Sequence, residues 1–260
     1  MVQVDTTVAH SARMYDYVLG GKDNYLADRE AAEEALKVWP ELWTSMRVNR
    51  AVMRRMAHWL ATEGGIRQFL DIGTGIPTSP NLHEVVQEVD PASRVVYVDN
   101  DPIVLAHARA LLAGAPQGRT AYVEADMRDS DVLFATPDLR ETLDLSRPVG
   151  VTVIAMLQFV EDAAGLIDEV TAHLAPGSYL ALTAATADLA RGSTALAEVY
   201  TRRGVPMYLR SCRELEALFA DRYDLVEPGV VPMQDWHPAE DEDSVGVEQT
   251  NMFAGLGRLR

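Results

Sequence analysis

Apolar runs of strand length alternate with longer amphipathic stretches along most of the chain. The apolar runs predict β-strands at 68–72, 94–98, 120–124, 148–155 and 178–183. Stretches with apolar residues at helical spacing predict helices at 28–38, 42–62, 82–89, 102–114, 131–143, 161–174, 188–203 and 211–219. Strands that alternate with helices in this way form a parallel sheet with right-handed crossovers.

Two further strands are predicted near the end of the chain, at 223–226 and 250–259. We therefore predict an α/β fold with a mainly parallel seven-stranded sheet and helices on both faces. The segment 228–243 is rich in proline and acids and predicts a surface loop containing Trp236 and His237. Residues 1–66 would form an N-terminal arm and helical cap and 67–260 the sheet domain, together one compact unit.

The predicted helix 42–62 carries methionines on one stripe and arginines elsewhere. Met46, Met53 and Met56 recur at helical spacing and predict filling of the core. The remaining positions predict a solvated basic face, which consists of Arg47, Arg50, Arg54 and Arg55.

The first predicted strand ends in a carboxylate and two glycines, in the run Gln68-Phe69-Leu70-Asp71-Ile72-Gly73-Thr74-Gly75. Without Cβ atoms, Gly73 and Gly75 let the backbone turn sharply and approach a bound molecule, and ligands of open α/β sheets lie beyond the carboxyl ends of the strands. A phosphate loop would need a lysine after the glycines, and residues 76–80 contain none. A dinucleotide fingerprint would need a third glycine where Thr78 stands. A purely structural turn and a turn that binds S-adenosylmethionine, which has no phosphate, both stay open.

A second carboxylate follows the second predicted strand. Asp99 stands 24 positions after Gly75, close to the spacing of about 20 expected of an acid that binds a ribose diol. A carboxylate suits this role because it accepts hydrogen bonds from both hydroxyls. A third acid, Asp126, follows the third predicted strand in the same order.

Three segments together carry a resemblance to a known family: the run from Arg13 to Tyr25, the motif Leu70-Asp71-Ile72-Gly73-Thr74-Gly75, and Val98-Asp99-Asn100-Asp101-Pro102. The chain resembles an actinobacterial family of S-adenosylmethionine-dependent methyltransferases, long described as a domain of unknown function, from Arg13 to the last strand. The resemblance implies a Rossmann-like class I methyltransferase fold, in which the last strand is antiparallel at the edge of the sheet, with S-adenosylmethionine as cofactor. It does not imply an acceptor.

The resemblance also implies which residues hold the cofactor. Asp71, Gly73, Thr74, Gly75, Asp99 and Asn100 match the first two motifs. At Asp126 the pattern implies an acceptor for the adenine amino group, and at Met127 a backbone N–H to the ring. Gln158 follows the fourth strand and is expected to contact the cofactor or the acceptor.

The run from Arg13 to Tyr25 is unusually rich in aromatic residues for a segment that follows a polar arm at 1–12. It combines three tyrosines with Gly20-Gly21 and a Lys22-Asp23-Asn24 cluster. We expect a lid over the cofactor, with Lys22, Asn24 and Tyr25 facing its amino-acid end or the acceptor; a helix that only supports the fold is the alternative. If this run is a lid, deletion of residues 1–25 should leave thermal unfolding largely intact and weaken cofactor binding.

Composition narrows the class of function. A formal net charge of −16 disfavours nucleic acid and anionic membranes. No apolar run reaches membrane-spanning length and no signal peptide is recognisable, so we expect a cytoplasmic protein. The single Cys212 and six scattered histidines predict no metal site. No general base stands out; the candidates are Tyr17, His83 and Tyr208.

The sequence thus favours a methyltransferase that acts on a small-molecule acceptor. A sensor or partner module that binds S-adenosylmethionine without turnover is the alternative. A nicotinamide oxidoreductase is disfavoured by the missing third glycine. The acceptor, the methylated atom and the oligomeric state are not predicted.

Overall fold

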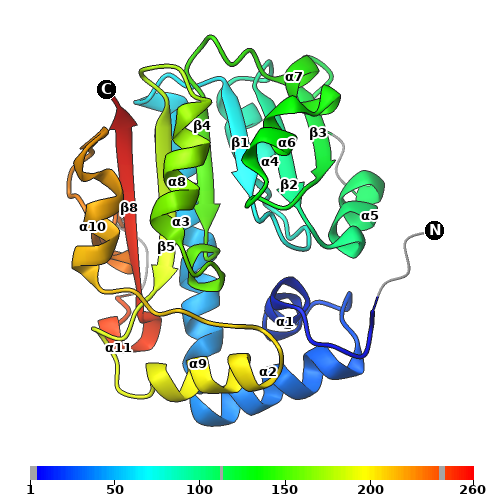
Figure 1. Cartoon of the computed structure of the whole chain (residues 1–260), viewed down its shortest axis with the longest axis vertical. Helices are drawn as coiled ribbons and strands as arrows, with labels where there is room; N and C mark the ends of the chain where they lie inside the picture. Colours follow the sequence, from blue (N-terminus) through cyan, green and yellow to red (C-terminus); the bar gives the residue numbers. More distant parts are fainter. Residues whose placement is uncertain (1–4, 112–113, 240–243) are drawn as a thin grey trace.

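The computed structural model of the protein describes residues 5–111, 114–239 and 244–260, and its central feature is an eight-stranded sheet (Figure 1). Positions 1–4 of the predicted arm and 240–243 of the predicted loop lie outside the described residues, as do residues 112–113 near the end of predicted helix 102–114. The strands are β1 Gln68–Ile72, β2 Arg94–Asp99, β3 Arg119–Glu124, β4 Gly150–Ile154, β5 Tyr179–Ala185, β6 Tyr223–Leu225, β7 Val231–Pro232 and β8 Met252–Leu259.

Five parallel strands have their carboxyl ends on the same side of the sheet, at the ends of the strands. β1 pairs with β2 and β4, β2 with β3, and β4 with β5, all in parallel. The strand order is β3-β2-β1-β4-β5-β8-β6, with β7 added to β8. The loops that follow β1, β2, β3 and β4 therefore lie together below the strand ends in Figure 1.

The prediction that the last strand forms the edge is wrong. β8 runs antiparallel to β5 over seven residue pairs and also pairs with β6, which is the edge strand. Its glycines let a neighbouring helix pack closely, because a Cβ atom at Gly257 would lie 2.6 Å from Phe219 Cδ1. An apolar strand that a helix approaches this closely is buried, and the short β6 covers its outer side.

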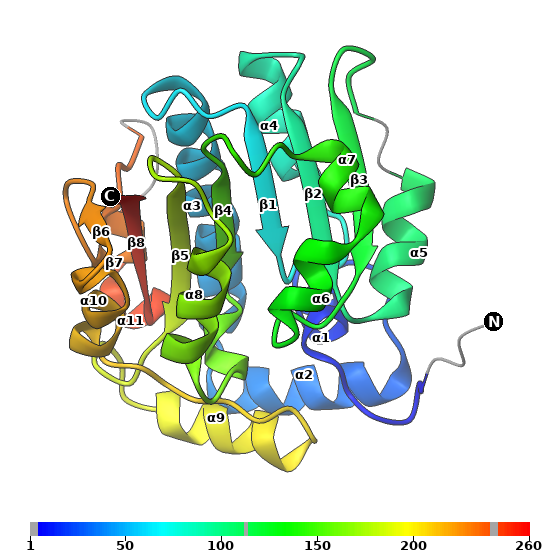
Figure 2. The same cartoon turned by 45° about the horizontal axis from the view of Figure 1, so that its top comes forward.

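Helices cover both faces of the sheet (Figure 2). One face carries α3 Leu42–Thr62 and α4 Leu82–Val89, with their apolar residues in one core cluster with β1, β2, β5 and β8. The other face carries α6 Ser130–Ala135, α7 Pro137–Thr142, α8 Ala163–Ala172 and α10 Cys212–Ala220. Helix α5 Pro102–Leu111 packs beside β2 and β3. No helix within these described ranges is long and apolar enough to cross a membrane.

Three helices lie across the carboxyl ends of the parallel strands: α1 Ser11–Val18, α2 Leu26–Val38 and α9 Ser193–Arg202 (Figures 1 and 2). They share a third apolar cluster in which Met14, Trp39 and Tyr200 are buried. Because Met14 is completely buried between these helices, deletion of residues 1–25 would open this cluster. We therefore no longer expect that deletion to leave thermal unfolding intact.

The segment 228–243 is not only a surface loop. Within it, Trp236 is completely buried against α3, next to the short helix η2 Met233–Asp235. Arg55 of α3 donates from Nε to the Trp236 carbonyl at 2.9 Å. The expected solvated face of arginines is thus wrong for Arg55, which holds a buried segment in place.

Candidate functional site

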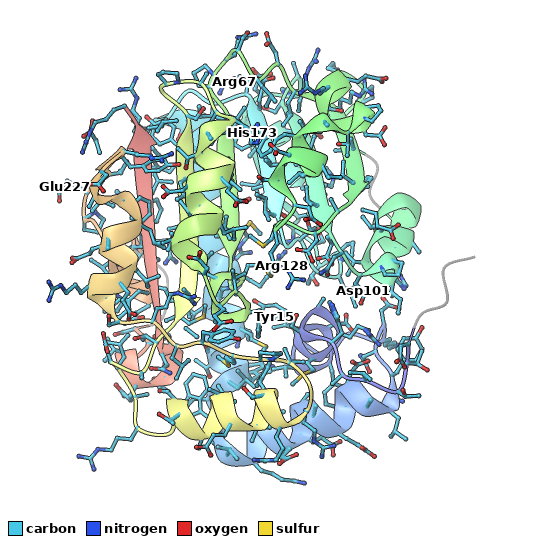
Figure 3. The ribbon with its side chains drawn as sticks, in the orientation of Figure 1. Tyr15, Arg67, Asp101, Arg128, His173 and Glu227 are labelled. Carbon is cyan, nitrogen blue, oxygen red and sulfur yellow. The ribbon has the colours of Figure 1, made fainter. Side chains whose placement is uncertain are left out.

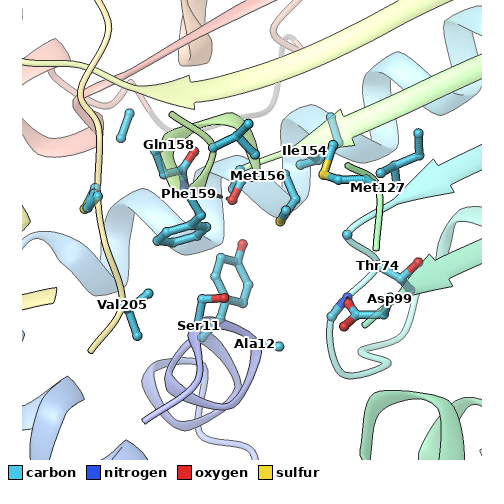
Figure 4. Close-up of a pocket in the computed structure, with 18 of the residues that line it drawn as sticks. Ser11, Ala12, Thr74, Asp99, Met127, Ile154, Met156, Gln158, Phe159 and Val205 are labelled. Atoms are coloured by element: carbon cyan, nitrogen blue, oxygen red, sulfur yellow. Dashed lines mark hydrogen bonds between the residues drawn. The ribbon is translucent and has the colours of Figure 1, made fainter. Parts of the chain in front are cut away.

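A cavity of about 770 Å³ lies where the carboxyl ends of the parallel strands meet α1 and α9. Figure 4 shows Thr74, Asp99 and Met127 on one side of it and Gln158, Phe159 and Val205 on the other. Its volume is in the range of about 300–1,000 Å³ that is usual for small-molecule sites.

The glycine turn after β1 forms one wall of the cavity. Gly73 and Gly75 have φ values of +73° and +68°, which L side chains rarely adopt. The backbone N–H groups of Gly73 and Thr74 both donate to the Val98 carbonyl, at 2.9 and 3.1 Å, which ties the turn to β2. A Cβ atom on Gly73 would lie 2.0 Å from Met156 Cγ. The turn therefore requires glycine both for its conformation and for contact with the loop after β4.

Asp99 ends β2 and faces this turn. Its side chain is buried; Oδ2 accepts from the Gly75 N–H and Oδ1 from the Asp101 N–H, each at 2.9 Å. Burial raises the pKa of Asp99, while these two hydrogen bonds lower it. Each carboxylate oxygen keeps a lone pair for a further donor, so Asp99 can still accept from two ligand hydroxyls.

Asp71 is a second acid in the wall, at the end of β1. Its Oδ1 accepts from the Thr152 hydroxyl at 2.5 Å. Burial raises the pKa of Asp71 to about 6, partly offset by Thr152 and by the nearby positive charge of Arg50. Asp71 forms no ion pair with any residue that the structure describes. Asp71 is half-buried, and a carboxylate in such a place without an ion pair is matched by a cationic ligand.

Asp126 and Met127 line the cavity after β3. The Asp126 carboxylate accepts from Arg128 Nε at 2.8 Å, and this bond, together with the rest of the ion pair, holds its pKa below the usual range. Asn100 also contributes a hydrogen bond that lowers the pKa of Asp126. Sequence reasoning missed Arg128, because an exposed arginine in a loop carries no pattern that distinguishes it.

Of the run from Arg13 to Tyr25, in which we expected a lid, Tyr15 lines the cavity. Figure 3 shows Tyr15 beside α1. Its neighbours Ser11 and Ala12, which we expected in the polar arm, line the cavity as well. Lys22, Asn24 and Tyr25 do not line it; Lys22 is exposed and Asn24 donates to Asp16 Oδ2 at 2.8 Å. Tyr25 lies instead under the Arg13 guanidinium, 5.6 Å from it.

A buried ion cluster fastens α1 to the end of β2. Arg13 Nε donates to Asp101 Oδ2 at 3.1 Å, and its Nη1 lies 3.5 Å from Asp28 Oδ2. His10 Nδ1 lies 3.3 Å from the same Asp101 oxygen. Because Asp101 also donates its backbone N–H to Asp99, the ion cluster that fastens α1 is connected to the acid in the cavity.

Of the three candidate bases, only Tyr208 lines the cavity. Tyr17 donates its hydroxyl to Glu33 at 2.9 Å outside it. His83 is buried beside Tyr97. The Tyr97 hydroxyl lies 2.8 Å from the His83 backbone nitrogen and 2.8 Å from His83 Nδ1. Burial lowers the pKa of His83, which packs in the core.

The far end of the cavity is largely apolar and aromatic. Its lining includes Trp39, Leu42, Phe159, Leu196, Tyr200, Val205 and Met207. Met46 and Met53, predicted as core, are buried and also line the cavity. Arg50, predicted as solvated, lines it too and donates to the Pro80 carbonyl at 2.7 Å. Helix α3 thus contributes to the site, which its local pattern did not reveal.

The fold and these residues define a class of protein: a Rossmann-like α/β protein with a nucleotide-type site at the carboxyl ends of its strands. A carboxylate with free lone pairs, a close glycine turn and a half-buried acid without an ion pair fit S-adenosylmethionine, which has a ribose diol and a cationic end.

Comparison with known proteins agrees with this class. The model of the S-adenosyl methyltransferase family matches residues 1–260, so the chain belongs to this family. This confirms the predicted family and its cofactor, S-adenosylmethionine.

Two solved structures share the whole fold. A DUF574 family protein from Streptomyces avermitilis MA-4680 is 50% identical, with a TM-score of 0.96, covering 99% of this chain and 100% of that one. A protein from Thermobifida fusca YX that is assigned as a methyltransferase is 40% identical, with a TM-score of 0.91, covering 98% and 97%.

A protein from Mycobacterium avium (strain 104), assigned as an S-adenosyl-L-methionine-dependent methyltransferase, is 29% identical over 175 residues. The match covers 65% of this chain and 51% of that protein, so the chain spans about half the length of this curated relative.

Proposed function

We propose that the chain transfers the methyl group of S-adenosylmethionine to a small molecule held in the same cavity. The observation that carries this proposal is one cavity that extends from the glycine turn and Asp99 to the apolar end next to α1 and α9. When bound, the cofactor supplies a methyl group already activated by a sulfonium. The protein then needs mainly to hold donor and acceptor in line, which contributes up to about 7–11 kcal/mol.

The proposed cofactor end is built from the strand ends. Asp99 would accept from the ribose hydroxyls, and Gly73 and Gly75 would let the backbone approach the cofactor. Asp71 would face its cationic part. We further assign Asp126 and Met127 to the adenine, with Thr74 and Asn100 beside them in the lining.

The acceptor is proposed to be a small molecule because α1 and α9 cross the strand ends and limit the space beyond the cofactor. The net charge of −16 disfavours nucleic acid. We assign no general base: Tyr15 donates its hydroxyl to the Met46 carbonyl at 3.0 Å and accepts from Asn49 at 3.2 Å. An acceptor that is nucleophilic without losing a proton needs no base.

The test is formation of S-adenosylhomocysteine. The protein is incubated with S-adenosylmethionine and fractions of a small-molecule extract, and mass spectrometry follows the product and any compound that gains a methyl group. We expect both to appear with the wild type and both to be strongly reduced with Asp99→Ala at the same cofactor concentration. Binding of the cofactor without product in any fraction would instead favour a module that binds without turnover.

A further inference from the structure

The amino-acid end of S-adenosylmethionine carries a carboxylate as well as an ammonium group, and the acids of the cavity wall can attract only the second. Asp71 and Asp99 both line the cavity at the glycine turn. Lys22, which we expected at this end of the cofactor, does not line the cavity. A bound carboxylate is held by cationic side chains or by N–H groups. The wall must therefore supply such a donor from another residue.

The described lining contains two arginines, and they differ in what they bind. Arg128 forms an ion pair with Asp126, whereas Arg50 forms none with any residue that the structure describes. Arg50 Nη2 donates to the carbonyls of Thr78 and Pro80, the latter at 2.7 Å. In the described part of the chain, Arg50 Nε and Nη1 have no hydrogen-bond partner, and they are accessible to solvent. These two nitrogens keep their hydrogens for a ligand, because a guanidinium can only donate.

Arg50 lies at the cofactor end of the cavity. Burial raises the pKa of Asp71 and of Tyr15, and the positive charge of Arg50 lowers both. These two residues line the cavity, as does Thr78, whose carbonyl accepts from Arg50. Asp71 precedes the glycine turn and Thr78 follows it, so Arg50 and Asp71 both lie at this turn. No ion pair joins these two side chains in the described structure, so each can attract a charge of the ligand.

We propose that Arg50 binds the carboxylate of S-adenosylmethionine, beside Asp71 at the ammonium group, and so selects a cofactor with an intact amino-acid end. This inference rests on the proposed function and adds a specificity residue. A zwitterion presents one charge to each of the two side chains. A ligand that has the amine and lacks the carboxylate brings a positive charge to Arg50 with nothing to balance it, and is disfavoured. The position of Arg50 at the glycine turn favours the carboxylate of the cofactor over a carboxylate of the acceptor.

Two ligands that differ by a single group test this selection. They are S-adenosylhomocysteine and its decarboxylated analogue, which keeps the amine. Each is titrated by calorimetry into the full chain at pH 8. We expect S-adenosylhomocysteine to bind about tenfold to a hundredfold more tightly than the analogue, as a hydrogen bond between charged groups provides.

Arg50→Gln removes the positive charge and should affect the two ligands differently. Binding of S-adenosylhomocysteine should weaken about fivefold or more, because its carboxylate loses a charged partner. The analogue should not weaken in this way, because its ammonium group no longer meets the guanidinium. The ratio of the two affinities should therefore fall toward one. A variant that only loosened the loop at Thr78 and Pro80 would weaken both ligands by the same factor and leave the ratio unchanged.

Arg54 offers a matched control on the same helix. It lies one turn further along α3, is exposed and is absent from the described lining. Arg54→Gln makes the same chemical change and should keep the wild-type ratio. Thermal unfolding shows whether each variant is folded. If Arg50→Gln does not fold, Arg50→Lys replaces it: lysine keeps the charge but lacks the planar group that reaches the carbonyls and the ligand together, so the ratio should fall about threefold or more.

The outcomes separate this inference from the proposed function. Equal binding of the two ligands to the wild type would overturn the inference. An unchanged ratio in the Arg50 variant, or an equal fall of the ratio in Arg54→Gln, would overturn it as well. Failure of S-adenosylhomocysteine to bind the wild type at all would instead overturn the proposed function on which the inference rests.

Discussion

Protonation of Asp71 is expected to weaken cofactor binding below pH 6. Burial raises the pKa of this carboxyl from 3.8 to about 6 in the free protein. Only the ionised form attracts the cationic part of the cofactor, so affinity is complete above pH 6 and is lost as pH falls through that value. Thr152 and Arg50 lower this pKa, and the negative charge of Asp99 raises it.

The size of the effect follows from the pKa. At pH 5 about one molecule in eleven has an ionised Asp71 if its pKa is about 6, so the apparent dissociation constant should rise about tenfold relative to pH 8. The raised pKa of Asp71 also makes the stability of the fold depend on pH, in the opposite direction to the affinity for the cofactor. Between pH 3.8 and about 6 the folded state holds the proton that the unfolded state releases, so stability falls as pH rises through this window.

Calorimetric titration of S-adenosylmethionine between pH 5 and pH 8 measures this profile. Asp71→Asn should flatten it and raise the melting temperature at pH 8, because no charge is buried. Thr152→Val removes a hydrogen bond that lowers the pKa, so the inflection should move to higher pH. A wild-type profile that Asp71→Asn leaves unchanged would refute the reasoning.

Three further predictions concern the same cavity. Asp99→Ala should weaken cofactor binding at least about tenfold in calorimetry, since a charged hydrogen-bond acceptor is lost; unchanged affinity in a folded variant would remove its proposed role. Gly73→Ala should lower both affinity and melting temperature because its Cβ meets Met156, and adding Met156→Ala should restore part of both; no recovery would mean that φ alone matters. Arg13→Gln removes the arginine from the buried Asp101 and should speed hydrogen exchange in α1 and weaken cofactor binding; unaltered exchange would show that this pair does not fasten α1.

The parts of the fold with strong local patterns were predictable. β1 and α3 have the predicted boundaries, because an apolar run that breaks into glycines and a long helical stripe are local features. Asp99 could be located for the same reason: an acid at the end of a buried strand must lie at the carboxyl edge of a parallel sheet, and the structure places it in the cavity wall.

The remaining features depend on pairings between distant segments. The interior position of β8 requires β6 to close over it, and burial of Trp236 requires a carbonyl contact with Arg55, 181 positions away. Neither pairing can be recognised from the residues next to it in the sequence. The residues around Trp236 have the composition of an exposed loop.

The N-terminal segment contacts the cavity through residues other than those we expected. The polar cluster at 22–24 suggested ligand contacts, but Asn24 donates to Asp16 within the same segment. The residues that reach the cavity, such as Ala12 and Tyr15, were hidden because their role depends on how α1 is oriented by the Arg13 pair with Asp101. Short polar motifs do not show which side of a helix will face a site formed by distant parts of the chain.

One measurement tests the central claim most directly: calorimetric titration of the full chain with S-adenosylmethionine and, in the same buffer at pH 8, with NAD. We predict micromolar binding of S-adenosylmethionine and no comparable binding of NAD. The reasons are the glycine turn with Thr78 in place of a third glycine, the free lone pairs of Asp99, and Asp71, which has no ion-pair partner among the described residues. Tight binding of NAD with none of S-adenosylmethionine would contradict the account.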